Sequence, residues 1–241
     1  MINTTNTTIE SRWARLGVLF NAEPSPESPD IERLILDTAR ELPSNPRLFP
    51  LVITWLVEHG FFVARHRLKH LVTTELEPEH QPVLGLLLDE AIAHGAPAEL
   101  RIVRDVCTPF TISRPLFDAY RDPSLADIAK SSASESSKWW GIWAPPVELK
   151  RDAVRPSRWI LEHNPHAFDR IVRRGDLRAS ILETLRIDLS GVVPSVAKLS
   201  RVIGATRVAV RAAIESLSQE GAIVAQSHQG STKEREIGLA A

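Results

Sequence analysis

Two arginines near the end of the sequence are the side chains best suited, by type and spacing, to bind an anion. Arg207 and Arg211 lie four residues apart in a segment that runs from Thr206 to Gly221 and has the periodicity of a helix. Residues four apart share a helix face, and this face is not the apolar one, so both guanidinium groups can point outward together. A guanidinium group is a planar fork of N–H donors that matches a phosphate or the edge of a guanine. These arginines are therefore the first candidates for a binding site.

The helix that carries them is preceded by a shorter helix and a tight turn. Leu199 and Ile203 are four apart and share one face of the shorter helix, which begins near Ser195. Ser200 is small where the two helices are expected to cross, which lets their backbones approach. Gly204 adopts, without steric cost, the positive φ that the turn needs.

Two strand-like runs follow the second helix. Val210 and Ile214 begin an apolar stripe with i, i+4, i+7 spacing, so one side of this helix is expected to pack on a core. The runs 222–226 and 234–239 have the apolar content of short strands. The segment 227–233 between them is polar and contains a glycine, which is typical of a hairpin tip.

Together these residues resemble the winged helix-turn-helix superfamily. The resemblance covers Ser195 to Leu239 together with a leading helix expected at Asp176–Asp188. It implies a three-helix core with a two-stranded wing, in which the second helix of the turn motif enters the major groove of DNA. For the whole chain, we predict a mainly α fold with an N-terminal helical bundle followed by this module.

The resemblance assigns further residues to a DNA-binding surface. Thr206 lies at the exposed start of the second helix, where its hydroxyl and backbone N–H can bond a phosphate. Ser195 and Lys198 begin the preceding helix, where contacts to the DNA backbone usually fall in this family. The expected wing contacts to the sugar-phosphate chain are His228, Lys233 and Arg235. The alternative is that all these basic residues form a solvated surface.

The charge distribution agrees with this assignment. Residues 1–147 hold 14 Lys/Arg and 19 Asp/Glu, a net charge of −5, whereas residues 148–241 hold 15 and 11, a net charge of +4. The basic half is the half with the expected turn motif, as a protein that binds phosphates requires. A split of this size also arises by chance.

Composition shifts along the chain predict four segments. We expect an N-terminal arm with a Pro-rich linker at 1–30, a helical bundle domain at 31–121 and a connector at 122–169. The winged helix-turn-helix domain is expected at 170–241. The connector contains the serine-rich run Ser131–Ser137, which has the composition of a flexible loop.

Two features of the N-terminal part admit a functional and a plain interpretation. The tryptophans of the connector, Trp139, Trp140 and Trp143, could stack on nucleobases or contact a protein, but we favour insertion into the groove between the domains. The basic run Arg65–His70 could contact nucleic acid or an acidic partner. For this run we favour a solvated helix face with Leu68 turned inward.

Several classes of protein fit the sequence poorly. Its single cysteine, Cys107, excludes an internal disulfide framework and fits a reducing compartment. No apolar run reaches the length of a membrane span and the first residues do not read as a secretory signal, so we expect a soluble, cytoplasmic protein. We find no metal-ligand spacing, phosphate-binding loop or nucleophile elbow. We therefore expect no cofactor, no metal and no enzymatic activity.

Double-stranded DNA is the ligand that these patterns favour. The predicted function is a DNA-binding protein, either a bacterial-type transcriptional regulator or a DNA-associated accessory factor. The alternative is a non-catalytic subunit of a multiprotein complex that uses the winged helix and the bundle as docking surfaces. The N-terminal helical half could bind a protein partner. A homodimer is also open, because no heptad seam that would decide the oligomeric state is visible.

Overall fold

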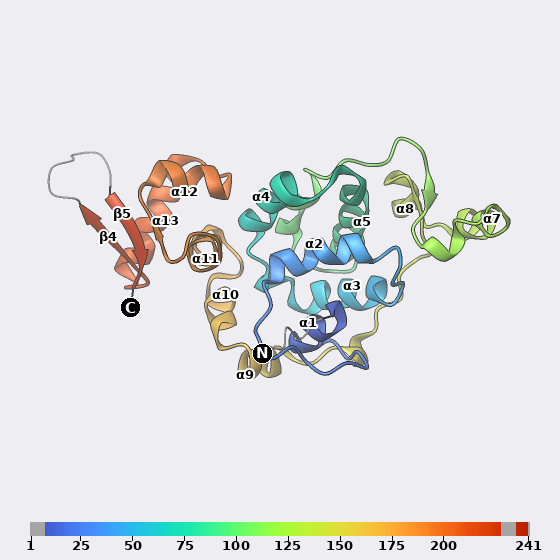
Figure 1. Ribbon diagram of the computed structural model, residues 1–241, viewed down its shortest axis with the longest axis horizontal. Helices are drawn as coiled ribbons and strands as arrows, with labels where there is room; N and C mark the ends of the chain where they lie inside the picture. The colour runs from blue at the N-terminus through green and yellow to red at the C-terminus, as the bar shows by residue number, and fades with distance from the viewer. Residues whose placement is uncertain (1–7, 228–234, 241) are drawn as a thin grey trace, which may run out of the picture.

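The computed structural model describes residues 8–227 and 235–240, which are mainly helical, as the sequence predicts (Figure 1). The helices are α1 (Ile9–Arg15), α2 (Ile31–Glu41), α3 (Leu48–His59), α4 (Arg65–Glu75), α5 (Gln81–Ala93), α6 (Arg101–Arg104), α7 (Pro123–Ser132), α8 (Glu135–Trp139), α9 (Ser157–His163), α10 (Phe168–Arg173), α11 (Leu177–Glu183), α12 (Val196–Ile203) and α13 (Arg207–Gln219). The strands are β1 (Arg114–Pro115), β2 (Ile142–Trp143), β3 (Val192–Val193), β4 (Ile223–Ser227) and β5 (Arg235–Leu239). No helix within the described ranges is both long and apolar enough to cross a bilayer.

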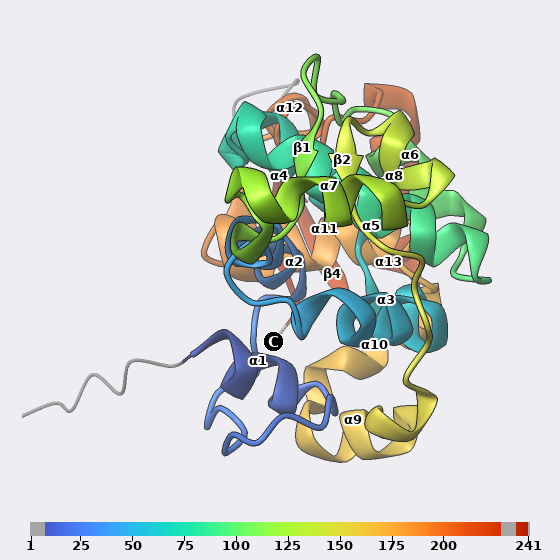
Figure 2. The ribbon, with the colours of Figure 1, turned by 90° about the vertical axis from the view of Figure 1, so that its right-hand side faces the viewer.

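A first hydrophobic core extends from Ile9 to Ala167. Helices α3 and α5 are apolar around most of their circumference, so they are buried at its centre and pack against each other. Helix α2 is amphipathic and adds one apolar face. The small parallel pair β1–β2 lies with α7 and α8 at the end of the molecule that faces the viewer in Figure 2.

The prediction of an N-terminal arm is wrong for α1 and the residues just after it, because Ile9, Trp13, Leu16 and Val18 belong to this core. The Trp13 ring is fully buried, and its indole N–H donates to the Thr38 hydroxyl over 2.9 Å. The indole N–H of Trp55 donates in turn to the Leu16 carbonyl, also over 2.9 Å. Within the described residues 8–30 of this segment, the proline-rich part that follows α1 is a loop.

The prediction of a flexible serine loop is also wrong, because the serines end one helix, cap the next and join the two. Ser134 is the N-cap of α8, and its hydroxyl accepts from the Ser137 backbone N–H. The buried Ser137 hydroxyl donates to the Ala144 carbonyl over 3.0 Å. The ring of Trp140 packs against α5, where a Cβ on Gly85 would come within 2.2 Å of it. Trp140 therefore fills the first core and not a groove between domains.

A second hydrophobic core contains residues from Ile181 to Ile237 and belongs to a separate C-terminal unit. The leading helix expected at 176–188 is present as α11 with its N-cap Asp176, and a π-helical turn (Thr184–Asp188) extends it. The expected strand pair forms as the antiparallel β4 and β5. Strand β3 was not predicted; it pairs with β5, which makes a three-stranded sheet in the order β3–β5–β4.

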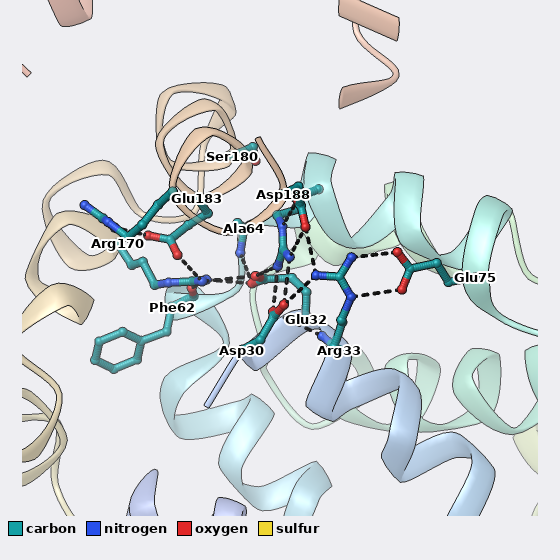
Figure 3. A network of polar contacts seen from close by, with 12 residues as sticks. Asp30, Glu32, Arg33, Phe62, Ala64, Glu75, Arg170, Ser180, Glu183 and Asp188 are labelled. Carbon is teal, nitrogen blue, oxygen red and sulfur yellow. Dashed lines mark hydrogen bonds and ion pairs between the residues drawn. The ribbon is translucent and has the colours of Figure 1, made fainter. Parts of the chain in front are cut away.

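The two units meet at a network of ion pairs, which Figure 3 shows from close by. The network is centred on Arg67 of α4. The Arg67 side chain is only 1% exposed, and its guanidinium group lies 2.6 Å from Asp30, 2.8 Å from Glu32 and 2.8 Å from Asp188. Asp188 belongs to the π-helical turn of the C-terminal unit. In the basic run 65–70, Arg67 is therefore neither a solvated side chain nor a candidate for contacts to a partner.

Two more arginines extend the network on either side of Arg67. Arg170 of α10 binds Glu32 over 2.6 Å and Glu183 of α11 over 2.8 Å. Arg33 of α2 binds Asp188 over 2.8 Å. The units are thus joined by paired charges, most of them buried, which tolerate separation poorly because an unpaired buried charge is costly.

Candidate nucleic-acid interface

The candidate site is built on the turn between α12 and α13. The turn residue Gly204 has φ +69°, a left-handed conformation that side chains with a Cβ rarely adopt. The Ser200 hydroxyl donates to the Ala205 carbonyl over 2.6 Å and closes the turn from the inside. Leu199 and Val210 are fully buried beneath it. The turn therefore holds α12 and α13 in a defined crossing.

The hydroxyl groups of Ser195 and Thr206 serve first as helix caps. Ser195 accepts from the Lys198 backbone N–H over 3.3 Å, and Thr206 accepts from the Ala209 backbone N–H over 3.3 Å. In the part of the chain that the structure describes, the backbone N–H groups of Arg207 and Val208 have no acceptor. The exposed start of α13 thus offers two free donors and a positive dipole end to an anion.

The candidate cations are exposed and have no ion-pair partner among the described residues. Arg207 and Arg211 lie on the solvent side of α13, and Lys198 and Arg201 lie on the solvent side of α12. None of the four forms an ion pair with any residue in the described ranges. Their charges are therefore available to an external anion.

The arginines at the other end of the same unit are arranged differently. Arg173 pairs with Asp169 over 2.9 Å and with Glu220 over 2.6 Å. Arg178 pairs with Asp176 over 3.0 Å and with Glu220 over 2.7 Å. The charges of Arg173 and Arg178 are thus neutralised within the protein, whereas the four cations of α12 and α13 have no ion-pair partner in the described ranges.

The structure describes only one of the three expected wing residues, and only its backbone. His228 and Lys233 lie outside the described residues. Arg235 begins β5 and is the ladder partner of Ser227, but the placement of its side chain is not described. The structure thus brings Ser195, Lys198, Thr206, Arg207 and Arg211 together around one turn, and the three wing residues stay a prediction.

Two residues of this surface were missed by the sequence reasoning. Arg201 lies three residues after Lys198, one turn along α12. Val208 is 77% exposed although it is a large apolar residue. A helical wheel of α13 would have found Val208, because it falls opposite the buried stripe of Val210 and Leu217.

Within residues 8–227 and 235–240, no three His, Cys, Asp or Glu side chains gather as metal ligands would. Burial raises the pKa of the Cys107 thiol to about 12, so this thiol is protonated at neutral pH.

The surface around the turn combines exposed cations, free backbone donors and a rigid pair of helices. Such a surface suits an extended polyanion better than a small ligand, because its charges are spread over two helices and not gathered into a pocket. Comparison of the chain with protein-family models, with curated proteins and with solved structures found no match.

Proposed function

We propose that the C-terminal unit is a winged helix-turn-helix that binds double-stranded DNA, with α13 in the major groove. The element order α11, β3, α12, α13, β4, β5 and the sheet order β3–β5–β4 support this reading. The recognition helix of such a motif contacts bases near its N-terminal end, while the preceding helix crosses the DNA backbone. On this reading Arg207 and Arg211 reach bases or phosphates, and Lys198 and Arg201 contact phosphates.

The observation that carries the proposal is the set of four exposed cations on α12 and α13 that have no ion-pair partner in the described ranges. A phosphate contact releases counterions from DNA, which makes binding favourable at low salt. Cations that are already paired within the protein contribute little to such a contact. The four cations around one turn therefore support α12 and α13 as the face that meets DNA.

The role that fits this proposal is a transcriptional regulator or a DNA-associated accessory factor. The ion-pair network centred on Arg67 joins the DNA-binding unit to the bundle, so a partner bound by the bundle would be carried to DNA. The second candidate function is a protein-interaction subunit. It is favoured by Glu215, an exposed acid on α13, and by the exposed Val208, neither of which contributes to phosphate binding.

The test is a titration of labelled random-sequence duplex DNA with the parent protein and with the double variant Arg207→Ala/Arg211→Ala, followed by fluorescence anisotropy. Each arginine that binds a base edge is worth about 1–3 kcal/mol, so the variant should bind at least tenfold more weakly. The matched control is Arg101→Ala/Arg155→Ala, which removes two exposed arginines of the first unit that have no ion pair in the described ranges. Equal binding by parent and double variant, or no binding by the parent at low salt, leaves the interaction subunit as the better reading.

A further inference from the structure

The exposed face of α13 has an apolar centre. Val208 is 77% exposed, more than any other large apolar side chain of the described C-terminal unit. Ala212, four residues later on the same face, is exposed as well. Arg207 and Arg211 flank these two residues along the helix. The face is therefore an apolar pair bordered by two free guanidinium groups.

The position of Val208 is not explained by packing. Successive residues of a helix are rotated by 100°, which puts Val208 almost opposite the buried stripe formed by Val210, Ala213 and Leu217. No neighbouring element of the described structure covers it. A solvated valine also makes the helix slightly less stable, because its branched side chain loses χ1 freedom there. The residue is therefore suited to an external contact.

The surrounding charge determines which kind of ligand fits. An apolar protein surface would have to desolvate the guanidinium groups of Arg207 and Arg211 when it covered Val208. Duplex DNA compensates for this desolvation, because phosphates and guanine edges accept hydrogen bonds from the guanidinium groups. The major groove also presents an apolar group. That group is the 5-methyl of thymine, which is the only methyl on the four standard bases in the groove.

We propose that Val208 and Ala212 contact thymine methyl groups, so that α13 prefers sites in which thymine lies next to the guanines read by its arginines. This inference rests on the proposed function, since it requires α13 to lie in the major groove. Burial of one methyl group in such a contact corresponds to about a fourfold gain in affinity. Thymine would thus be selected by its methyl group and not by a hydrogen bond.

The experiment uses uracil, which differs from thymine only by that methyl group. A random-sequence duplex pool is first enriched for binding to the full-length parent protein. The enriched pool is then amplified with either dTTP or dUTP, and the affinity of each product is measured by anisotropy at one salt concentration. The variant is Val208→Ser, and the matched control is Val172→Ser, which replaces another exposed valine, on α10 (57% exposed).

The parent and Val172→Ser should bind the thymine pool about fourfold more tightly than the uracil pool for each methyl group contacted. Val208→Ser should discriminate between the two pools about fourfold less than the parent, because only the contact of Val208 is lost. Circular dichroism should show an unchanged fold because the site is exposed. Equal, salt-dependent binding of both pools by the parent overturns the thymine contact and leaves DNA binding intact. Discrimination in Val208→Ser that equals that of the parent also overturns it. Failure of the parent to bind any pool overturns both proposals.

Discussion

Replacement of Arg67 by alanine should destabilise the protein far more than replacement of an exposed arginine. The Arg67 guanidinium group is 1% exposed and binds carboxylates from two units of the chain. Arg67→Ala would leave Glu32 with Arg170 alone, and would leave Asp30 and Asp188 with Arg33 alone. Removal of one partner from a buried ion pair costs about 3–5 kcal/mol, since the remaining charge stays desolvated.

The pKa of Asp30 supports this magnitude. Burial alone would raise that pKa, but hydrogen bonding and attraction from Arg67 outweigh it and lower the pKa from 3.8 to about 2. A shift of this size corresponds to about 2 kcal/mol from one carboxylate. The pKa of Asp188 is likewise raised by burial and lowered more strongly by Arg67 and Arg33.

These lowered pKa values also predict the pH dependence. A carboxylate whose folded pKa is depressed stabilises the protein above its unfolded pKa, and this stabilisation is lost as the pH falls through the folded pKa. For Asp30 the window runs from just above pH 4 to about pH 2. The parent should therefore lose stability over this window, and Arg67→Ala should lose less of it there.

The assay is urea unfolding followed by circular dichroism at neutral pH and at pH 3. The matched control is Arg40→Ala, because Arg40 also pairs with two acids, Asp37 and Glu77, but is 30% exposed. Exposed pairs contribute up to about 1 kcal/mol, so the control should change the free energy of unfolding little. If Arg67→Ala costs no more than Arg40→Ala at neutral pH, the network does not hold the two units together as we infer.

Three further predictions concern the proposed interface. If Arg211 reads a base, Arg211→Ala should relax the sequence preference at one base position. If Arg211 binds phosphate, the variant should bind all duplexes more weakly to the same extent, and its salt slope should fall by about one. Binding to an enriched and to a scrambled duplex separates the two outcomes. Glu215→Gln should strengthen binding to random duplex DNA, because it removes a negative charge from the exposed face of α13, and an unchanged affinity would mean that this face does not meet DNA. Gly204→Ala should lower the free energy of unfolding by about 1–2 kcal/mol because φ is +69°, and a stability equal to the parent in urea would show that the turn relaxes.

The parts of the fold that follow from local sequence could be predicted. The periodicity of Val210, Ile214 and Leu217 fixes which side of α13 is buried, and all three are 6% exposed or less. The caps Asp176 and Thr206 mark helix starts, because each side chain accepts from a backbone N–H only two or three residues later. The same helical periodicity puts Arg207 and Arg211 on another side of α13, so their exposure could also be expected.

What depends on contacts between distant residues could not be predicted. Trp13 is held by Thr38, and nothing in the composition of the first residues points to that partner. Arg67 belongs to a basic run, and only the carboxylates brought by α2 and the π-helical turn explain its burial. Strand β3 has two residues, Val192 and Val193, too few for an alternating pattern to be visible.

The measurement that tests the central claim most directly is the salt dependence of duplex DNA binding. The parent is compared with a variant in which Lys198, Arg201, Arg207 and Arg211 are all replaced by alanine. Each phosphate contact contributes about −0.9 to the slope of log K against log salt, so the parent should show a slope between about −2 and −4. The variant should lose most of this slope together with most of its affinity at low salt, while circular dichroism shows the same helical content. A parent that does not bind duplex DNA at low salt, or a variant with the slope of the parent, would contradict the assignment of the α12–α13 surface to DNA.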